Sequence, residues 1–277
     1  MIWWWRTMKE IIIKNLNFSY KKGEEILKNV NLDFDSTSTA IIGQNGAGKT
    51  TFVKLLKGLL KPCSGDILIH NINTKEITVA ELSKYIGLVF QNPNDQIFKN
   101  KIIDEVMFGP LNIGLSREKA MENSINALKM VGLEDRLNDN PYDLGLSDRK
   151  LISIASIIAM NTDIIILDEP TIAQDYKGRE KIKQIIEKLK EQRKLVITII
   201  HDMDFVAECF ERTIVFNKGE VLLDGNTGDV FTDEETINKA YLEIPHITQL
   251  CKKLGYDHTF LTVEEFIEAY KKSIYKI

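Results

Sequence analysis

The glycine-rich stretch GQNGAGKT, Gly43 to Thr50, constrains the fold more than any other feature of this sequence. It follows the apolar run TAIIG, and the segment after it, KTTFVKLLKGLL, spaces its apolar side chains as a helix does. Glycines let several backbone N–H groups converge on phosphate oxygens at a helix N-terminus, where the helix dipole favours negative charge. The order strand, glycine loop and helix therefore predicts a phosphate-binding loop within a nucleotide-binding core.

The loop supplies polar side chains as well as backbone donors. The Lys49 ammonium would reach the β and γ phosphates, and the Thr50 hydroxyl can ligate Mg²⁺. We therefore expect ATP and Mg²⁺ as cofactors. The expected nucleotide contacts of this loop are Gly43, Gln44, Asn45, Gly46, Ala47, Gly48, Lys49, Thr50 and Thr51.

Polar residues also follow three other apolar runs that we predict to be strands. Asp168 and Glu169 end IIILDE, and His201 follows LVITII. We expect Asp168 to hold the metal through its water, Glu169 to orient or deprotonate an attacking water, and His201 to sense the γ-phosphate. Gln91, at the end of the predicted strand KYIGLVFQ, would contact Mg²⁺ or the water. These residues suffice for ATP hydrolysis if a second surface closes the site.

Strands alternate with helices along most of the chain, which indicates a layered α/β core. The segment from about 92 to 147 is mainly helical, and we expect a helix from Asp148 onward. Residues 236–277 form a charged helical tail. Residues 1–8, with three adjacent tryptophans, are interpreted as an extension before a natural start at Met8.

Composition restricts the possible partners and compartments. The chain has 277 residues and a formal net charge of -4, so no overall positive field would attract nucleic acid. Cys63, Cys209 and Cys251 are widely spaced, which fits a reducing compartment and argues against a disulfide framework or a zinc site. The longest apolar runs are about half of the roughly 20 residues that a membrane-spanning helix needs.

Five segments together resemble the ATP-binding cassette (ABC) ATPases: GQNGAGKTT, VFQNPNDQ, ILDEPT, AQD and IIHD. This resemblance covers residues 9–235. More narrowly, VFQNPNDQIF, DEVMFGPLNIGL and EIPHIT are similar to the ATPases of energy-coupling-factor (ECF) importers. The resemblance implies a P-loop NTPase core, of the ABC ATPase type, with an antiparallel β subdomain and an inserted helical subdomain.

The resemblance also implies a head-to-tail dimer in which each ATP lies between the phosphate loop of one subunit and the signature segment of the other. Tyr20 would then stack on adenine, and Asp175 would act across the interface. The signature residues would be Gly145, Leu146 and Ser147, which also count as nucleotide contacts.

The signature segment departs from the family pattern. A gap-free alignment places LGLSD, Leu144 to Asp148, on Leu-Ser-Gly-Gly-Gln, which removes the serine and puts Leu146 where backbone approaches phosphate. Sliding the alignment by two residues would rotate the following helix by roughly 200° and expose its apolar face. Two interpretations stay open: a weak signature that impairs the opposite site, or a competent variant in which Ser147 or the helix N-terminus supplies donors.

We therefore expect an ATP-binding and ATP-hydrolysing subunit of an ECF-type ABC importer of vitamins or transition-metal ions. Its partners would be a second ABC ATPase subunit, with a heterodimer favoured over a homodimer, a membrane-embedded coupling protein and a substrate-binding membrane subunit, without nucleic acid. The subunit would lie peripherally on the cytoplasmic face of the cell membrane. The alternatives are a soluble ABC ATPase not linked to transport and an ATP-binding regulatory subunit with weak hydrolysis. Neither a repeated phosphate loop nor a long heptad insert supports the first, and intact Glu169 and His201 weigh against the second.

Overall fold

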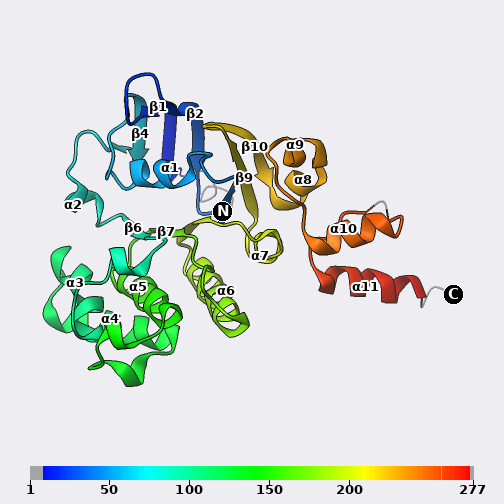
Figure 1. Cartoon of the computed structure of the whole chain (residues 1–277). Helices are drawn as coiled ribbons and strands as arrows, with labels where there is room; N and C mark the ends of the chain where they lie inside the picture. Colours follow the sequence, from blue (N-terminus) through cyan, green and yellow to red (C-terminus); the bar gives the residue numbers. More distant parts are fainter. Residues whose placement is uncertain (1–8, 257, 275–277) are drawn as a thin grey trace, which may run out of the picture.

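The computed structural model describes residues 9–256 and 258–274, so the predicted extension 1–8 lies outside the described residues. Two sheets organise the described part of the chain (Figure 1). The first is antiparallel, with strand order β2-β1-β4-β5. Its strands are β1 (Ile11–Ser19), β2 (Glu25–Phe34), β4 (Ser64–Ile69) and β5 (Ile72–Asn73).

The second sheet has the order β10-β9-β3-β8-β7-β6 and is parallel except for its last hairpin strand, β10. Its strands are β3 (Thr39–Ile42), β6 (Ile86–Val89), β7 (Ile164–Asp168), β8 (Leu195–Ile199), β9 (Arg212–Asn217) and β10 (Glu220–Asn226). Strands β3, β6, β7 and β8 are buried throughout, because both faces of the sheet are covered.

Two hydrophobic cores lie on opposite faces of this parallel sheet. Along β7, Ile164 and Ile166 pack into the core shared with the antiparallel sheet and α1 (Lys49–Leu56), whereas Ile165 and Leu167 pack into the core shared with the other helices. This alternation explains why the four residues IIIL are all apolar: each side chain is buried on one face or the other. The expected α/β fold is confirmed by this architecture.

The helical segment after β6 sits on one side of the sheet (Figure 1). It contains α3 (Ile102–Asn112), α4 (Arg117–Val131) and the start of α5 (Leu146–Ala159), with short 3-10 turns at Pro93–Asp95, Glu134–Arg136 and Pro141–Asp143. Helix α2 (Val79–Leu82) precedes β6, and α6 (Tyr176–Glu191) follows β7. Helix α6 buries Ile182, Ile185, Ile186 and Leu189, whose spacing places them on one face of the helix.

The C-terminal part of the described chain is helical. Helix α7 (Met203–Cys209) lies between β8 and β9. Within the described residues, β10 is followed by α8 (Thr227–Thr232), α9 (Glu234–Lys239), α10 (His246–Lys253) and α11 (Val263–Ile274). Helices α10 and α11 lie at the opposite end of the molecule from α3 and α4 (Figure 1). Within residues 9–256 and 258–274, no helix has the length and apolar character needed to cross a membrane.

Strand register decides where the functional side chains meet. Val89 of β6 lies opposite Leu167 of β7, and Asp168 of β7 lies opposite Ile199 of β8. The residues that follow these strands therefore emerge together at the carboxyl edge of the sheet, where ligands bind in open α/β sheets. One expectation is corrected: β6 ends at Val89 rather than at Gln91, so Gln91 lies on the connecting segment after the strand, from which its side chain reaches Glu169.

Candidate functional site

The phosphate loop connects β3 to α1, as its sequence predicted. Gly43 has a positive φ, and a Cβ there would lie 2.3 Å from the carbonyl oxygen of Phe216, so only glycine fits. Gly48, also at positive φ, caps α1 without a side-chain hydrogen bond. The backbone N–H groups at this helix start are consequently left for a ligand.

Lys49 is buried at the base of the loop and contacts its backbone. Its Nζ donates to the carbonyl oxygens of Gly43 at 2.6 Å and Gln44 at 2.9 Å. Burial lowers the pKa of Lys49, while the charges of Glu169 and Asp168 oppose that shift. The ammonium is thus held inside the loop, close to two carboxylates, where it can attract phosphate oxygens.

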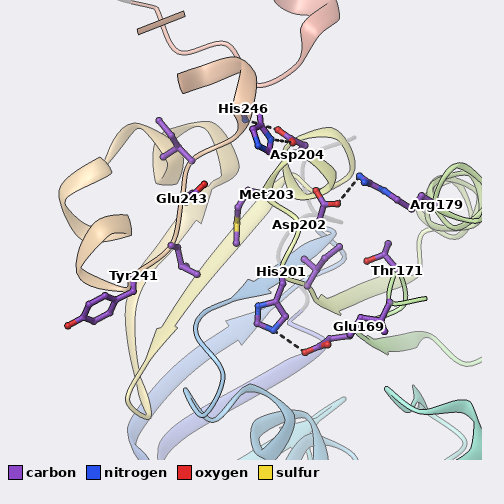
Figure 2. A pocket seen from close by; sticks show the side chains of 14 residues that line it. Glu169, Thr171, Arg179, His201, Asp202, Met203, Asp204, Tyr241, Glu243 and His246 are labelled. Atoms are coloured by element: carbon purple, nitrogen blue, oxygen red, sulfur yellow. Dashed lines mark hydrogen bonds and ion pairs between the residues drawn. The ribbon is translucent and has the colours of Figure 1, made fainter. Parts of the chain in front are cut away.

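Glu169 directly follows β7, and its carboxylate contacts side chains from the segments that follow β6 and β8. Its carboxylate Oε2 accepts a hydrogen bond from Nε2 of Gln91 at 2.9 Å. Its Oε1 lies 3.0 Å from Nε2 of His201 (Figure 2). Its backbone has a φ of 48°, which is unusual for a non-glycine residue, and its N–H donates to the carbonyl of Ile199 at 3.0 Å. Backbone strain of this kind concentrates at functional sites.

Asp168 ends β7 and carries an unsatisfied oxygen. Burial raises the pKa of Asp168 to about 6, and a hydrogen bond from Thr50 opposes the shift. Among the described residues, its Oδ1 is buried without a hydrogen-bond partner. Thr50, Gln91 and Asp168 border a cavity of about 440 Å³. A buried orphan carboxylate oxygen beside a hydroxyl fits a Mg²⁺ ion that completes its shell with phosphates and water.

Tyr20 lies at the edge of the phosphate loop. Its hydroxyl is 3.3 Å from Oγ1 of Thr51, and its ring is 57% exposed. The Tyr20 ring packs edge to face against the Phe18 ring at a centroid distance of 4.9 Å, and this contact orients the Tyr20 ring. An exposed aromatic face fixed beside the loop can stack on a base.

The signature residues occupy the first turn of α5. This helix begins at Leu146, two residues before the expected start at Asp148, and Gly145 is its N-cap. Leu146 is half exposed, and no atom lies within 4 Å of a Cβ built on Gly145. The early helix start orients the N–H groups of Leu146 and Ser147 outward from the first turn, where no intrahelical partner exists.

Ser147 is tied to the segment that carries Asp175. Its Oγ donates to Oε1 of Gln174 at 2.7 Å, and Nε2 of Gln174 lies 3.4 Å from the Ser147 carbonyl oxygen. Asp175 in turn caps α6 by accepting from the N–H of Gly178 at 2.8 Å. A hydroxyl has a single proton, so Ser147 can donate to a phosphate only after releasing Gln174.

The structure therefore gathers the predicted residues into two groups. One joins Lys49, Asp168, Glu169, Gln91 and His201 at the carboxyl edge of the sheet. The other joins the signature residues to the Asp175 segment through Ser147.

Sequence reasoning missed three polar residues that brace these groups: Arg149, Lys150 and Gln174. Lys150 is buried in an otherwise apolar stretch, and its Nζ donates to the carbonyl oxygens of Phe90 and Gln91. The signal was present in SDRKLISIASIIA, where a lysine falls on the buried face of the helix. A buried ammonium needs acceptors, so that lysine pointed to a nearby polar segment.

A second cavity, of about 630 Å³, is bordered by Glu169 and His201 and by residues of the C-terminal part of the chain (Figure 2). Asp202 pairs with Arg179 at 2.9 Å, and Asp204 pairs with His246 at the start of α10. Tyr241 and Glu243 border the same cavity. The C-terminal helical tail thus contacts the segment that follows the histidine.

Comparisons with known proteins agree with this geometry. The ABC transporter family model matches residues 27–172. An ABC transporter ATP-binding protein of Pyrococcus furiosus is 42% identical over 246 residues, covering 88% of this chain and 94% of that protein. An energy-coupling factor transporter ATP-binding protein of Clostridium perfringens is 39% identical over 254 residues, covering 88% and 89%.

Solved structures show the same fold. The structure of CbiO1 from Clostridium perfringens, part of the ABC transporter complex CbiONQ, superposes with a TM-score of 0.75 at 33% identity, covering 88% of this chain and 99% of that one. A dimeric ATP-binding cassette bound to ADP and Pi superposes with a TM-score of 0.71 at 32% identity, covering 78% and 98%. The resemblance inferred from sequence is confirmed: this chain belongs to the ABC transporter family, as an ATP-hydrolysing, ATP-binding subunit of the group that includes the energy-coupling factor ATPases.

Proposed function

We propose that this chain is the ATP-hydrolysing subunit that energises an ECF-type importer of vitamins or transition-metal ions, bound peripherally at the cytoplasmic face of the membrane. The observation that carries the proposal is the Glu169 carboxylate held between Gln91 and His201, beside the phosphate loop. An ATP-binding subunit without hydrolysis would not need a carboxylate held in this way. The similarity to energy-coupling factor ATPases supports the transport role.

Hydrolysis would follow from positioning and charge. The backbone N–H groups of the loop and Lys49 would bind the β and γ phosphates, and Thr50, Asp168 and Gln91 would hold Mg²⁺. When bound, Mg²⁺ neutralises charge that develops on the phosphate oxygens. Glu169 would orient the attacking water or accept its proton, with His201 contacting the γ-phosphate. Such groups accelerate the reaction because they are already oriented.

A second ATPase subunit would complete each site. Tyr20 would stack on the adenine, and the partner would present its own signature segment to this chain's phosphates. In exchange, this chain would offer Gly145, Leu146, Ser147 and Asp175 to the partner's ATP. Because Ser147 is already bonded to Gln174, the signature of this chain is short of a hydroxyl donor. This favours a heterodimer with a partner whose signature is intact.

The membrane-embedded coupling protein would dock in a groove between the core and the helical insert. This groove, of about 290 Å³, is bordered by Phe98, Phe108 and Met160, together with Glu105 and Gln96. The Phe98 and Phe108 rings meet edge to face at a centroid distance of 4.7 Å and are 52% and 40% exposed. Exposed aromatic rings of this kind are typical of interaction sites. The substrate-binding membrane subunit would join through the coupling protein.

Purification of the tagged chain from its native membrane tests this proposal. We expect a second ABC ATPase and a multi-spanning membrane protein to co-purify, and the complex reconstituted in vesicles to import substrate with ATP. Phe98→Asp should release the membrane protein while leaving the ATPase pair intact; Leu254→Asp, at the end of α10 where the residue is 59% exposed, is the control for an added surface charge. Co-purification with ribosomes or DNA, or import that continues without ATP, would contradict the proposal and favour a soluble ABC ATPase.

A further inference from the structure

Lys150 is an ammonium group in the hydrophobic interior. Only 2% of the residue is exposed, and its neighbours Leu151 and Ile152 are buried core residues of α5. Burial lowers the pKa of Lys150 to about 8, while the charges of Asp168 and Glu169 oppose the shift. Burying an amine costs free energy unless acceptors compensate for the lost water. The acceptors here are two adjacent backbone carbonyls.

Those carbonyls belong to Phe90 and Gln91. Nζ of Lys150 donates to the Phe90 carbonyl oxygen at 3.0 Å and also to that of Gln91. The side chain of the same Gln91 donates to Oε2 of Glu169 at 2.9 Å. A continuous series of hydrogen bonds therefore runs from Lys150 through Gln91 to the carboxylate beside the phosphate loop.

Two further side chains fasten the same segment to α5. Gln96 accepts from the Phe90 N–H at 3.1 Å, and its Nε2 donates to the Ser153 carbonyl oxygen at 3.0 Å. Arg149 donates to Oδ1 of Asn94 at 3.0 Å. These hydrogen bonds hold residues 90–96 against α5, although the contacting residues lie about 60 positions apart in the sequence.

Arg149 also holds the segment that precedes α5. Its Nε and Nη2 donate to the carbonyl oxygens of Leu144 at 3.0 Å and Tyr142 at 2.8 Å. Arg149 and Lys150 are adjacent on α5, and their hydrogen bonds therefore hold both the signature segment and the Gln91 segment against this helix. A change in the position of α5 would move both together.

We propose that Lys150 is a positioning residue that fixes Gln91, and through it the Glu169 carboxylate, to the helix that begins at the signature segment. The role rests on the proposed ATPase function, since α5 would move when the second subunit closes on Gly145–Ser147. Closure at the opposite ATP would then be transmitted to this chain's own catalytic carboxylate. A displacement of about 1 Å at a reacting group can cost on the order of 10²-fold in rate.

Steady-state ATPase assays of the assembled complex test this role with Lys150→Met, Gln91→Ala and the double variant. We expect Lys150→Met to lower kcat about 10- to 100-fold with the KM for ATP nearly unchanged, because the Lys49 and loop contacts remain. The double variant should be no slower than Gln91→Ala alone, because Lys150 acts only through Gln91. Lys150→Arg, which keeps a buried donor, should recover part of the rate.

Lys194→Met is the matched control. Lys194 is also buried, and its Nζ donates to the carbonyl oxygens of Asn161 at 3.3 Å and Thr162 at 2.8 Å, away from Gln91. Its variant should keep the parental kcat even if the melting temperature falls. Should Lys150→Met not fold, Lys150→Gln provides the same comparison.

Additive losses in the double variant, or an unchanged kcat in Lys150→Met, would overturn the positioning role. If kcat fell equally in Lys150→Met and Lys194→Met, the positioning role would also be overturned, because the loss would then reflect a general effect of removing a buried lysine. The assay measures hydrolysis rather than import. A complex that hydrolyses ATP but does not transport would therefore contradict the proposed import function, and the effect of Lys150→Met on kcat could still be measured.

Discussion

Replacement of Glu169 by Gln removes a charge while preserving shape. The glutamine can keep both contacts: its Oε1 would accept from Nε2 of Gln91, now 2.9 Å from the carboxylate, and its Nε2 would donate to His201, now 3.0 Å away. The second contact requires the neutral tautomer of His201 with an unprotonated Nε2. Fold and ATP affinity should therefore be retained, because the Lys49 contacts are untouched.

The magnitude follows from the role of the carboxylate. Loss of a positioned general base typically lowers the rate about 10²- to 10⁴-fold, which corresponds to roughly 3 to 5 kcal/mol of activation free energy. An additional consequence is electrostatic: the negative charge of Glu169 would no longer repel the γ-phosphate, so the affinity for ATP should stay equal or rise.

Steady-state and single-turnover ATPase rates, together with equilibrium binding of a fluorescent ATP analogue, separate chemistry from binding. Glu211→Gln is the matched control, because that glutamate pairs with Lys190 at 3.3 Å on the surface and is well exposed. It should hydrolyse ATP at the parental rate. If Glu169→Gln in the assembled complex also reached the parental rate, Glu169 would not be the base. A loss of ATP binding would instead show that the carboxylate is structural.

In the heterodimer, Lys49→Ala should nearly abolish hydrolysis and the matching lysine change in the partner should be milder, by roughly 10²- to 10³-fold; equal losses would show that LGLSD is a competent signature. The ATPase rate of Ser147→Ala shows which group of LGLSD donates hydrogen bonds to the partner's phosphates. A rate within about threefold of the parent indicates backbone donors, whereas a larger loss indicates that the Ser147 hydroxyl leaves Gln174 and donates to phosphate. Gln91→Ala should reduce the transport per ATP more than the affinity for ATP, and equal reductions would argue against coupling. The hydrogen bond and charge of Asp204 raise the pKa of His246 above 6.5, so their pair stabilises the docked α10 at lower pH and is lost as pH rises through the raised pKa. Hydrogen exchange of α10, corrected for intrinsic rates, should therefore increase as the pH is raised above 6.5, and no such increase should occur in His246→Gln.

The sequence was sufficient for the parts of the site that are local. The phosphate loop is one continuous segment. Its glycines are needed where other backbone comes close, since a Cβ on Gly43 would lie 2.3 Å from the carbonyl oxygen of Phe216. Asp168 and Glu169 could be placed because they lie at the end of the buried strand β7, and His201 because it lies two residues after the buried strand β8. Parallel strands end at one edge of a sheet. The α/β class likewise followed from periodicity, which reports burial of one element at a time.

Element boundaries were less certain, for physical reasons visible in the structure. The apolar pattern of α5 starts after Asp148, yet the helix itself begins at Leu146, because Gly145 can cap it and the exposed first turn needs no apolar face. Strand β6 ends at Val89 although apolar residues continue to Phe90. Pairing with β7 stops there, and pairing depends on the neighbouring strand rather than on the segment itself.

The sequence by itself determined that this protein folds around a phosphate loop with acids and a histidine at the strand ends. Only the tertiary structure decided what those residues contact. Lys150 reaches Gln91 across 59 positions, and Ser147 reaches Gln174 across 27. Such hydrogen bonds depend on the angle and distance at which α5 packs against the sheet, which arise from the whole core. Periodicity shows which face of a helix is buried, but the partner of a polar group on that face is set by packing.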